Sequence, residues 1–220
     1  MTRTQLHACA TRYYKRGGGT TPDVALIVYG NAEAVFKDYG RAASGGFGRV
    51  IAPLLLWREA TALNALDGLT GVPRVYRRVD ARGLLIEHCP ATVWPQARAG
   101  DAAYARLEAL VQAMHDRGIA HGDLRGGGNI LVDEQDQPYL VDFVSRIRRG
   151  STWNWPWNWL FRQFVTADES ALAKLRLRYA RHLAEPDDER RAHPDTPLTR
   201  AARWIGLTVR RCVRCFSASD

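Results

Sequence analysis

One short stretch of the sequence gathers side chains that can hold a metal ion and accept a proton. Asp123 and Asn129 lie on a polar loop that leads into the apolar run 130–132. Asp142 follows a second apolar run, 139–141. Because a polar turn joins the two runs, a hairpin would return Asp142 to the side of Asn129. Two oxygen ligands at one point suit Mg²⁺ that carries phosphates, and the remaining acid, Asp123, can accept a proton from a hydroxyl. Each residue alone is common in turns, so this interpretation depends on all three together.

These residues stand in a pattern that resembles the protein-kinase-like superfamily. Residues 121–132 read HGDLRGGGNILV, and residues 142–143 read DF. The superfamily pattern is His-x-Asp-Leu-x-x-x-Asn followed by Asp-Phe-Gly. The chain looks most similar to the small prokaryotic branch that contains the RIO kinases and the lipopolysaccharide-core (Kdo and heptose) kinases. The resemblance implies that Asp123 is the catalytic base and that Asn129 and Asp142 hold Mg²⁺.

The same resemblance implies a set of nucleotide-binding residues upstream. It requires a lysine on the third strand of the small lobe, and Lys37 in the run AVFK is the candidate. A glutamate on the next helix should pair with that lysine, and Glu59 stands there. Glu87 falls where the adenine-binding hinge belongs, and Arg125 would steady the transferring phosphate. Without the resemblance, a lysine or glutamate at such positions is by default a solvated residue.

Two glycine-rich stretches compete for the role of the loop that covers the phosphates. The stretch 45–50, GGFGRV, looks more like a kinase glycine-rich loop, but that loop must precede the lysine strand. After this stretch the next lysine is Lys174, which comes too late in the chain. We therefore expect the phosphate-covering loop to lie earlier, at Gly17, Gly18 and Gly19.

The hydrophobic pattern predicts the elements that must position these residues. The β-rich runs 24–29 and 34–37 flank a turn signal and predict a hairpin. Apolar residues at helical spacing predict a helix over 53–66, which Pro53 would begin after a loose glycine-rich linker, 40–48.

Further strands are predicted over 72–79 and 83–88, and further helices over 101–117, near 168–184 and over 199–216. This order predicts an α+β chain with a bilobal protein-kinase-like fold, in which a small β-rich N-lobe precedes a reduced, mostly helical C-lobe. The predicted parts are an N-lobe over 1–89, a hinge and reduced C-lobe over 90–185, and a polar linker with a basic amphipathic helix over 186–220.

The composition excludes several classes of protein. The chain has 220 residues, 46% of them apolar, and a net charge of +8. Because no apolar run reaches 18 residues, no transmembrane helix is expected. The N-terminus has no apolar signal core, and four cysteines make no disulfide framework. The sequence therefore predicts a cytoplasmic protein, either free or peripheral on the inner face of the cytoplasmic membrane.

Two segments after the site remain open to more than one interpretation. Tryptophans alternate at Trp153, Trp155, Trp157 and Trp159. They can stack on sugars or lie at a membrane interface, but we favour a buried role in a shortened C-lobe. Pro156 is expected to break any long helix there.

The last segment places five arginines on one face of its predicted helix, namely Arg200, Arg203, Arg210, Arg211 and Arg214. This Arg200–Arg214 tail would suit an anionic membrane surface, or it would pack on the C-lobe with its arginines solvated. No motif supports nucleic-acid binding.

The motif departs from the superfamily pattern in three ways. Asn129 follows Asp123 by six positions instead of five, Val144 stands where a glycine is usual, and no Ala-Pro-Glu motif follows. The last departure argues for a sugar, lipid or other small acceptor. We expect an ATP- and Mg²⁺-dependent kinase that phosphorylates a hydroxyl of a lipopolysaccharide-core sugar or another envelope glycolipid. The alternatives are a RIO-like serine/threonine protein kinase and a catalytically weak pseudokinase that binds nucleotide.

Overall fold

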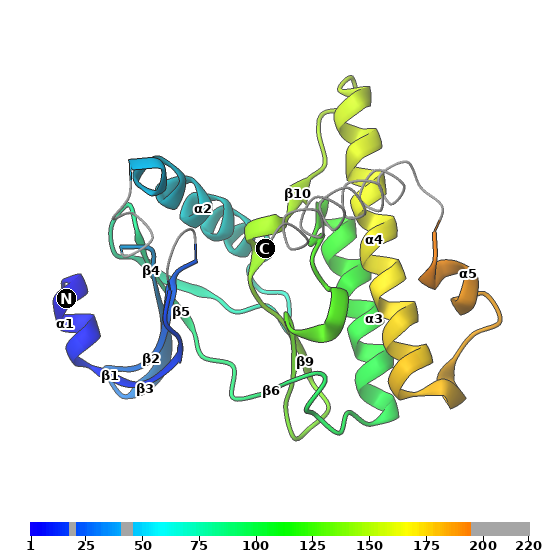
Figure 1. The fold of residues 1–220 in the computed structure, drawn as a ribbon, viewed down its shortest axis with the longest axis horizontal. Helices are drawn as coiled ribbons and strands as arrows, with labels where there is room; N and C mark the ends of the chain where they lie inside the picture. The colour runs from blue at the N-terminus through cyan, green and yellow to red at the C-terminus, as the bar shows by residue number, and fades with distance from the viewer. Residues whose placement is uncertain (18–20, 41–45, 195–220) are drawn as a thin grey trace, which may run out of the picture.

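The computed structural model describes residues 1–17, 21–40 and 46–194. There the chain forms two lobes, a five-stranded antiparallel sheet with two helices and a second, mostly helical part (Figure 1). This is the α+β, two-lobed architecture that the sequence predicts. The first lobe comprises α1 (Arg3–Ala8), β1 (Ala10–Lys15), β2 (Asp23–Tyr29), β3 (Ala32–Asp38), α2 (Gly46–Ala65), β4 (Val75–Arg78) and β5 (Gly83–Glu87).

The sheet has the strand order β1-β2-β3-β5-β4. Strands β2 and β3 form the predicted hairpin and pair along their whole length around Gly30, which has φ +64°. Side chains alternate between the two faces of a strand. Ala34 and Phe36 therefore face the small core beneath α1, whereas Val35 and Lys37 face α2 and the second lobe. This alternation places the candidate lysine between the lobes.

Neither α1 nor β1 was indicated by the sequence pattern. Only Leu6 of α1 is buried, so the helix has no apolar stripe. Strand β1 is an edge strand without a buried residue, and it lacks the strict alternation that marks a half-buried strand.

The helix α2 begins earlier than predicted. It runs from Gly46 to Ala65 and contains Pro53 in its interior, so the prediction that Pro53 begins the helix is wrong. A proline inside a helix leaves the carbonyl four residues before it without a partner. That carbonyl belongs to residue 49, and the next residue, Val50, is 75% exposed. A backbone carbonyl beside an exposed residue can bond to water, which makes a proline inside the helix tolerable.

The second lobe is built on two long helices that pack against each other. Its elements are β6 (Thr92–Val93), α3 (Asp101–Asp116), β7 (Ile119–Ala120), the 3-10 turn η2 (Arg125–Gly127), β8 (Ile130–Val132), β9 (Pro138–Leu140), η3 (Phe143–Ser145), β10 (Ile147–Arg148), α4 (Trp155–Tyr179), η4 (Arg181–Leu183) and α5 (Asp188–Ala192). One hydrophobic core joins the lobes, since it contains Leu56 and Leu63 of α2, Leu84 of β5 and Leu107 of α3.

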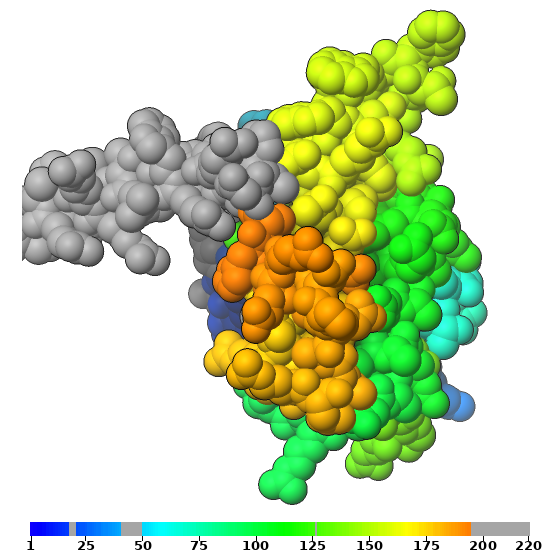
Figure 2. Space-filling model, turned by 90° about the vertical axis from the view of Figure 1, so that its right-hand side faces the viewer, coloured from blue at the N-terminus to red at the C-terminus, as the bar shows by residue number. Residues whose placement is uncertain are grey.

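The helix α4 also begins earlier than predicted. It starts at Trp155, and Pro156 stands in its first turn, so the expectation that Pro156 breaks the helix is wrong. A proline is tolerated in a first turn because the backbone N–H groups there have no partner within the helix. The side chain of Asn154 accepts a hydrogen bond from the Trp157 N–H at 3.4 Å and caps the start. The start of α4 extends beyond the rest of the lobe (Figures 1 and 2).

The tryptophans on this extension are exposed, so the preferred interpretation of a buried role is wrong. Their exposed fractions are 94% for Trp153, 73% for Trp155, 44% for Trp157 and 41% for Trp159. The predicted tail Arg200–Arg214 and the glycines Gly18 and Gly19 lie outside the described residues. Within the described ranges, no helix is long and apolar enough to cross a membrane.

Candidate active site

A buried ion pair connects β3 to α2. The Lys37 ammonium donates a hydrogen bond to Oε1 of Glu59, and the two side chains are 8% and 1% exposed. The Tyr39 hydroxyl donates to the other oxygen of Glu59 at 3.4 Å. Burial would lower the pKa of Lys37, but the carboxylates of Glu59 and Asp142 outweigh that effect and raise this pKa above its ordinary value. Lys37 is therefore a fixed positive charge within electrostatic reach of Asp142.

The loop between β7 and β8 holds Asp123 and Asn129 together. The side-chain amide of Asn129 donates to the backbone oxygen of Asp123 at 2.8 Å and to its Oδ2 at 3.1 Å. Both bonds use the nitrogen of the amide, which leaves its Oδ1 available as an oxygen ligand. The loop thus orients one carboxylate and one amide oxygen from residues that lie six positions apart.

The additional residue in this loop is accommodated by the turn η2. Its last residue, Gly127, has φ +72°, and a Cβ at that position would lie 3.1 Å from the Cβ of Trp94. A residue with a side chain would be strained in this conformation. The turn therefore accommodates the extra residue between Asp123 and Asn129, and the two residues stay in contact.

Asp142 returns to the side of Asn129 as the hairpin predicts. Strands β8 and β9 pair in register, and the Val141 N–H donates to the Asn129 carbonyl at 3.0 Å. The backbone of Asp142 has φ +65° and ψ +65°, which is uncommon for a residue other than glycine. Such strain often accompanies a functional constraint. The following residue, Phe143, is fully buried against the ring of His121.

The donor set fits a magnesium ion that carries phosphates. Mg²⁺ in such sites takes one or two protein oxygens, with water and phosphate oxygens completing the octahedron. The Asp142 carboxylate and the Oδ1 of Asn129 could supply these oxygens, because Asn129 precedes β8 and Asp142 follows β9, the strand that pairs with β8. Within the described part of the chain, no cluster of three or more His, Cys, Asp or Glu side chains forms a metal site of the all-protein kind.

Asp168 of α4 fixes the backbone before the loop, a role that the sequence pattern did not indicate. Its fully buried carboxylate accepts hydrogen bonds from the N–H of His121 at 2.7 Å and from that of Gly122 at 2.8 Å. It also lies 3.1 Å from Nε2 of His115 on α3. The only sequence signal was an aspartate among the apolar residues of a helix, because a buried acid requires partners.

Two arginines connect α2 to the segment after Asp142. Arg58 donates from Nε to the Val144 carbonyl at 3.0 Å and from Nη2 to the Arg146 carbonyl. Arg146 in turn donates from Nε to the Arg58 carbonyl at 3.1 Å. Because Arg58 precedes Glu59, these bonds hold the helix that carries the glutamate against the segment that carries Asp142.

The other predicted residues have different surroundings. The Glu87 carboxylate accepts a hydrogen bond from the N–H of Arg74, the residue before β4, at 3.0 Å. Arg125 begins η2 and is exposed. Gly17 lies so close to the backbone of residues 21–23 that a Cβ would be only 2.3 Å from the Thr21 oxygen.

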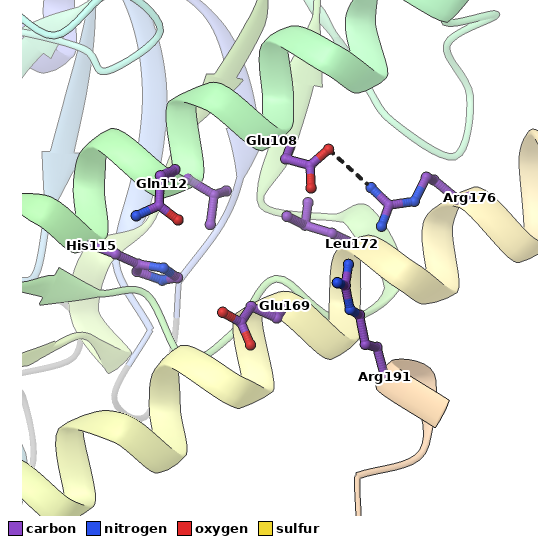
Figure 3. Close-up of a pocket in the computed structure, with 8 residues that line it drawn as sticks. Glu108, Gln112, His115, Glu169, Leu172, Arg176 and Arg191 are labelled. Atoms are coloured by element: carbon purple, nitrogen blue, oxygen red, sulfur yellow. Dashed lines mark hydrogen bonds and ion pairs between the residues drawn. The ribbon is translucent and has the colours of Figure 1, made fainter. Parts of the chain in front are cut away.

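A cavity of about 280 Å³ lies between α3 and α4 (Figure 3). His115 lines it and connects it to Asp168. Its charged groups are largely paired, since Arg176 binds Glu108 at 3.3 Å and Arg191 binds Glu185 at 3.0 Å. We therefore assign the cavity no part in the site.

The two lobes, with a lysine–glutamate pair in one and the aspartate and asparagine loop in the other, define a protein-kinase-like fold, as the motif predicts. No protein-family model matches the sequence, and no curated protein matches it significantly. Among solved structures, the fold is similar to Rio2 kinase from Chaetomium thermophilum. The Rio2 complex described as ADP/Mg²⁺-phosphoaspartate gives a TM-score of 0.60 at 19% identity and covers 84% of this chain.

A second Rio2 structure from the same organism gives a TM-score of 0.60 at 17% identity and covers 87% of this chain. This chain spans 64% of the length of the first Rio2 structure and 67% of the second. The fold is therefore RIO-like. The relation to lipopolysaccharide-core kinases stays a prediction.

Proposed function

We propose that this protein is a kinase that transfers the γ-phosphate of Mg-ATP to a hydroxyl group. The observation that carries the proposal is the convergence of a buried lysine–glutamate pair with three metal- and proton-binding side chains. Lys37 is paired with Glu59, and the Asp142 carboxylate contributes to the raised pKa of Lys37. Val141, which precedes Asp142, donates its N–H to the Asn129 carbonyl, and Asn129 binds Asp123. The similar Rio2 structure, which contains ADP and Mg²⁺, supports the same cofactors here.

Each side chain has one role in this proposal. Lys37 binds the phosphates, and Glu59 keeps it extended and charged. Asn129 and Asp142 would hold Mg²⁺, which neutralises phosphate charge when bound. Asp123 accepts the proton of the attacking hydroxyl. Because the residues are preorganised, catalysis comes mainly from positioning and charge neutralisation.

The residues around the nucleotide have supporting roles. The backbone near Glu87 would contact the adenine, since the Glu87 side chain is engaged by Arg74. Arg125 is exposed beside the loop and would reach the transferring phosphate. The stretch Gly17, Gly18 and Gly19 would cover the phosphates, and at Gly17 the close backbone contact already requires glycine.

For the acceptor we propose a sugar hydroxyl on an envelope glycolipid, such as a lipopolysaccharide-core sugar. The chain passes from Asp142 through η3 and β10 directly into α4, which begins at Trp155. No Ala-Pro-Glu motif follows Asp142, and the superfamily resemblance links that motif to the platform for protein substrates. A compact acceptor therefore suits the site better than a protein segment.

The second candidate is a RIO-like serine/threonine protein kinase. It is favoured by the similarity to Rio2 over 84% of the chain. The two candidates differ only in the acceptor, so both predict the same nucleotide chemistry and the same roles for Lys37 and Asp123.

The test is to measure Mg-ATP binding and phosphate transfer for the wild type and for Lys37→Met. The matched control is Lys15→Met, because Lys15 is an exposed lysine on β1. We expect Lys37→Met to reduce transfer by about 100-fold or more and the control to leave it unchanged. Equal transfer in both variants would contradict the proposal. Radiolabel from γ-labelled ATP in a glycolipid fraction, as opposed to serine or threonine, separates the two acceptors.

A further inference from the structure

The start of α4 forms a convex, aromatic projection, which we call the tryptophan tip and define as residues 153–159. Trp153 and Trp155 are 94% and 73% exposed, and Trp157 and Trp159 are 44% and 41% exposed. Exposure therefore falls from the tip toward the body of the lobe. Among the described aromatic residues, none stacks on these four rings. Exposed apolar groups gathered in this way commonly mark an interaction site.

The base of the tip is positively charged and contains no acid. Residues 143–167 include four arginines and no Asp, Glu or Lys. Arg146 is buried and bonds to α2, whereas Arg148, Arg149 and Arg162 are exposed. Within the described part of the chain, none of these three forms an ion pair. The surface thus offers positive charge to an external anion.

The rings and the charges lie at different depths. Arg162 follows Trp155 by seven residues, or roughly 10 Å along a helix. Arg148 lies at the base as well, because its carbonyl accepts the indole N–H of Trp157 at 2.7 Å. Amphipathic helices bury their apolar groups roughly 5–10 Å into the boundary between lipid head groups and acyl chains. Rings inserted to that depth would bring the arginines to the level of the lipid phosphates.

We propose that the tryptophan tip docks the protein on an anionic lipid bilayer. Indole rings prefer the interface between water and hydrocarbon because they are apolar and carry one polar N–H group. A projection also fits a deformable surface, whereas a protein partner or a second copy would need a matching hollow. Strand β10 at the base pairs with β7, which leads into His121. Docking would therefore bring the candidate active site close to the lipid head groups.

The proposal can be tested by vesicle co-sedimentation of the full chain without nucleotide, so that the result does not depend on kinase activity. The vesicles contain phosphatidylcholine alone or phosphatidylcholine with phosphatidylglycerol. The variants are Trp153→Ala with Trp155→Ala, and Arg162→Gln. The control is Tyr179→Ala, which removes an exposed aromatic ring at the other end of the same helix.

We expect the wild type and the control to bind the anionic vesicles and to bind phosphatidylcholine weakly. The double tryptophan variant should lose roughly tenfold or more in partition coefficient, with an unchanged unfolding transition. Arg162→Gln should weaken binding at low salt and leave it nearly unchanged at high salt. Brominated lipids should quench tryptophan fluorescence in the wild type and much less in the double variant.

Three outcomes would overturn the proposal. The first is a wild type that does not bind anionic vesicles. The second is a double variant that binds them as tightly as the wild type, which would place the binding site elsewhere in the chain. The third is a requirement for the tryptophans in self-association or in binding of soluble sugars, without a requirement in vesicle binding.

Discussion

At Gly127 a left-handed backbone conformation keeps Asn129 in contact with Asp123. Its φ is +72°, and the site a Cβ would occupy lies close to Trp94. The next residue, Gly128, has φ −68° and open space around it. A side chain would therefore be strained at Gly127 but not at Gly128, and this difference allows a direct test.

We predict that Gly127→Ala destabilises the protein by about 1–2 kcal/mol, the cost of a side chain in the left-handed region. It should also lower phosphate transfer, since Asn129 would shift. Gly128→Ala should change stability by about 0.5 kcal/mol or less. Chemical denaturation and transfer assays on both variants check this, and equal effects of the two substitutions would count against the assigned role of Gly127.

The buried pair of Lys37 and Glu59 is a second residue-level feature. Replacement of one partner leaves the other charge buried without compensation, which typically costs about 3–5 kcal/mol. We predict a loss of this size for Lys37→Met, and we predict that adding Glu59→Gln recovers much of it. A double-mutant cycle by urea denaturation measures the interaction energy between Lys37 and Glu59. Additive effects of the two substitutions on the free energy of unfolding would refute this interaction.

At the scale of elements, α4 organises the site from behind. Asp168 reaches from this helix to the backbone before the loop and to His115 of α3. The Arg58 and Arg146 bonds give α2 a similar attachment to η3. The candidate active site is therefore held by helices on both sides, and a change in either helix should alter its geometry.

We predict that Asp168→Asn lowers the free energy of unfolding by about 2–4 kcal/mol. Asparagine keeps one side-chain oxygen but has an NH₂ group in place of the other, so one of the two backbone N–H groups loses its acceptor. The transfer rate should fall while the dissociation constant for nucleotide stays nearly constant, since Asp168 bonds to the backbone before the loop and to His115, whereas the candidate nucleotide-binding residues lie on other elements. The control is Glu169→Gln on the exposed side of α4. If nucleotide binding fell in parallel with the transfer rate, Asp168 would support the whole fold instead of positioning the loop.

At the scale of the whole molecule, the buried Asp188 carboxylate makes stability depend on pH at low pH. Asp188 of α5 binds Arg176 of α4 through both oxygens, at 2.7 and 2.8 Å. The hydrogen bonds to Arg176 hold the pKa of Asp188 below its ordinary value of 3.8. A lowered pKa in the folded state stabilises the protein above pH 3.8, and this contribution is lost as the pH falls through the lowered pKa.

We predict that Asp188→Asn destabilises the protein by about 2–3 kcal/mol at neutral pH and makes stability less dependent on pH below about 4. The neighbouring Asp187→Asn should have an effect below about 1 kcal/mol, because its ion pair with Arg190 is exposed. Thermal unfolding across pH 2–7 checks both, and a wild-type acid slope retained in Asp188→Asn would contradict the assignment.

The sequence predicted the elements whose signals are local. The hairpin of β2 and β3 follows from alternation, and the return of Asp142 to Asn129 follows from two short apolar runs. It did not predict the early starts of α2 and α4, because Pro53 and Pro156 suggested helix boundaries. The structure instead has Pro53 inside α2 and Pro156 in the first turn of α4.

Two other features depend on tertiary contacts. Asp168 is identifiable only when α4 is placed against the loop, and the exposure of the tryptophans depends on how far α4 extends beyond the core. A statistical preference for buried tryptophan cannot reveal such a projection.

The most direct test of the account is phosphate transfer by Asp123→Asn, with Mg-ATP binding measured by calorimetry on the same preparation. Asp67→Asn, at an exposed aspartate after α2, is the control. We predict that Asp123→Asn binds Mg-ATP within about threefold of the wild type and transfers phosphate about 10²–10⁴ times more slowly. Transfer at the wild-type rate in Asp123→Asn, or a wild type that does not bind Mg-ATP, would contradict the account.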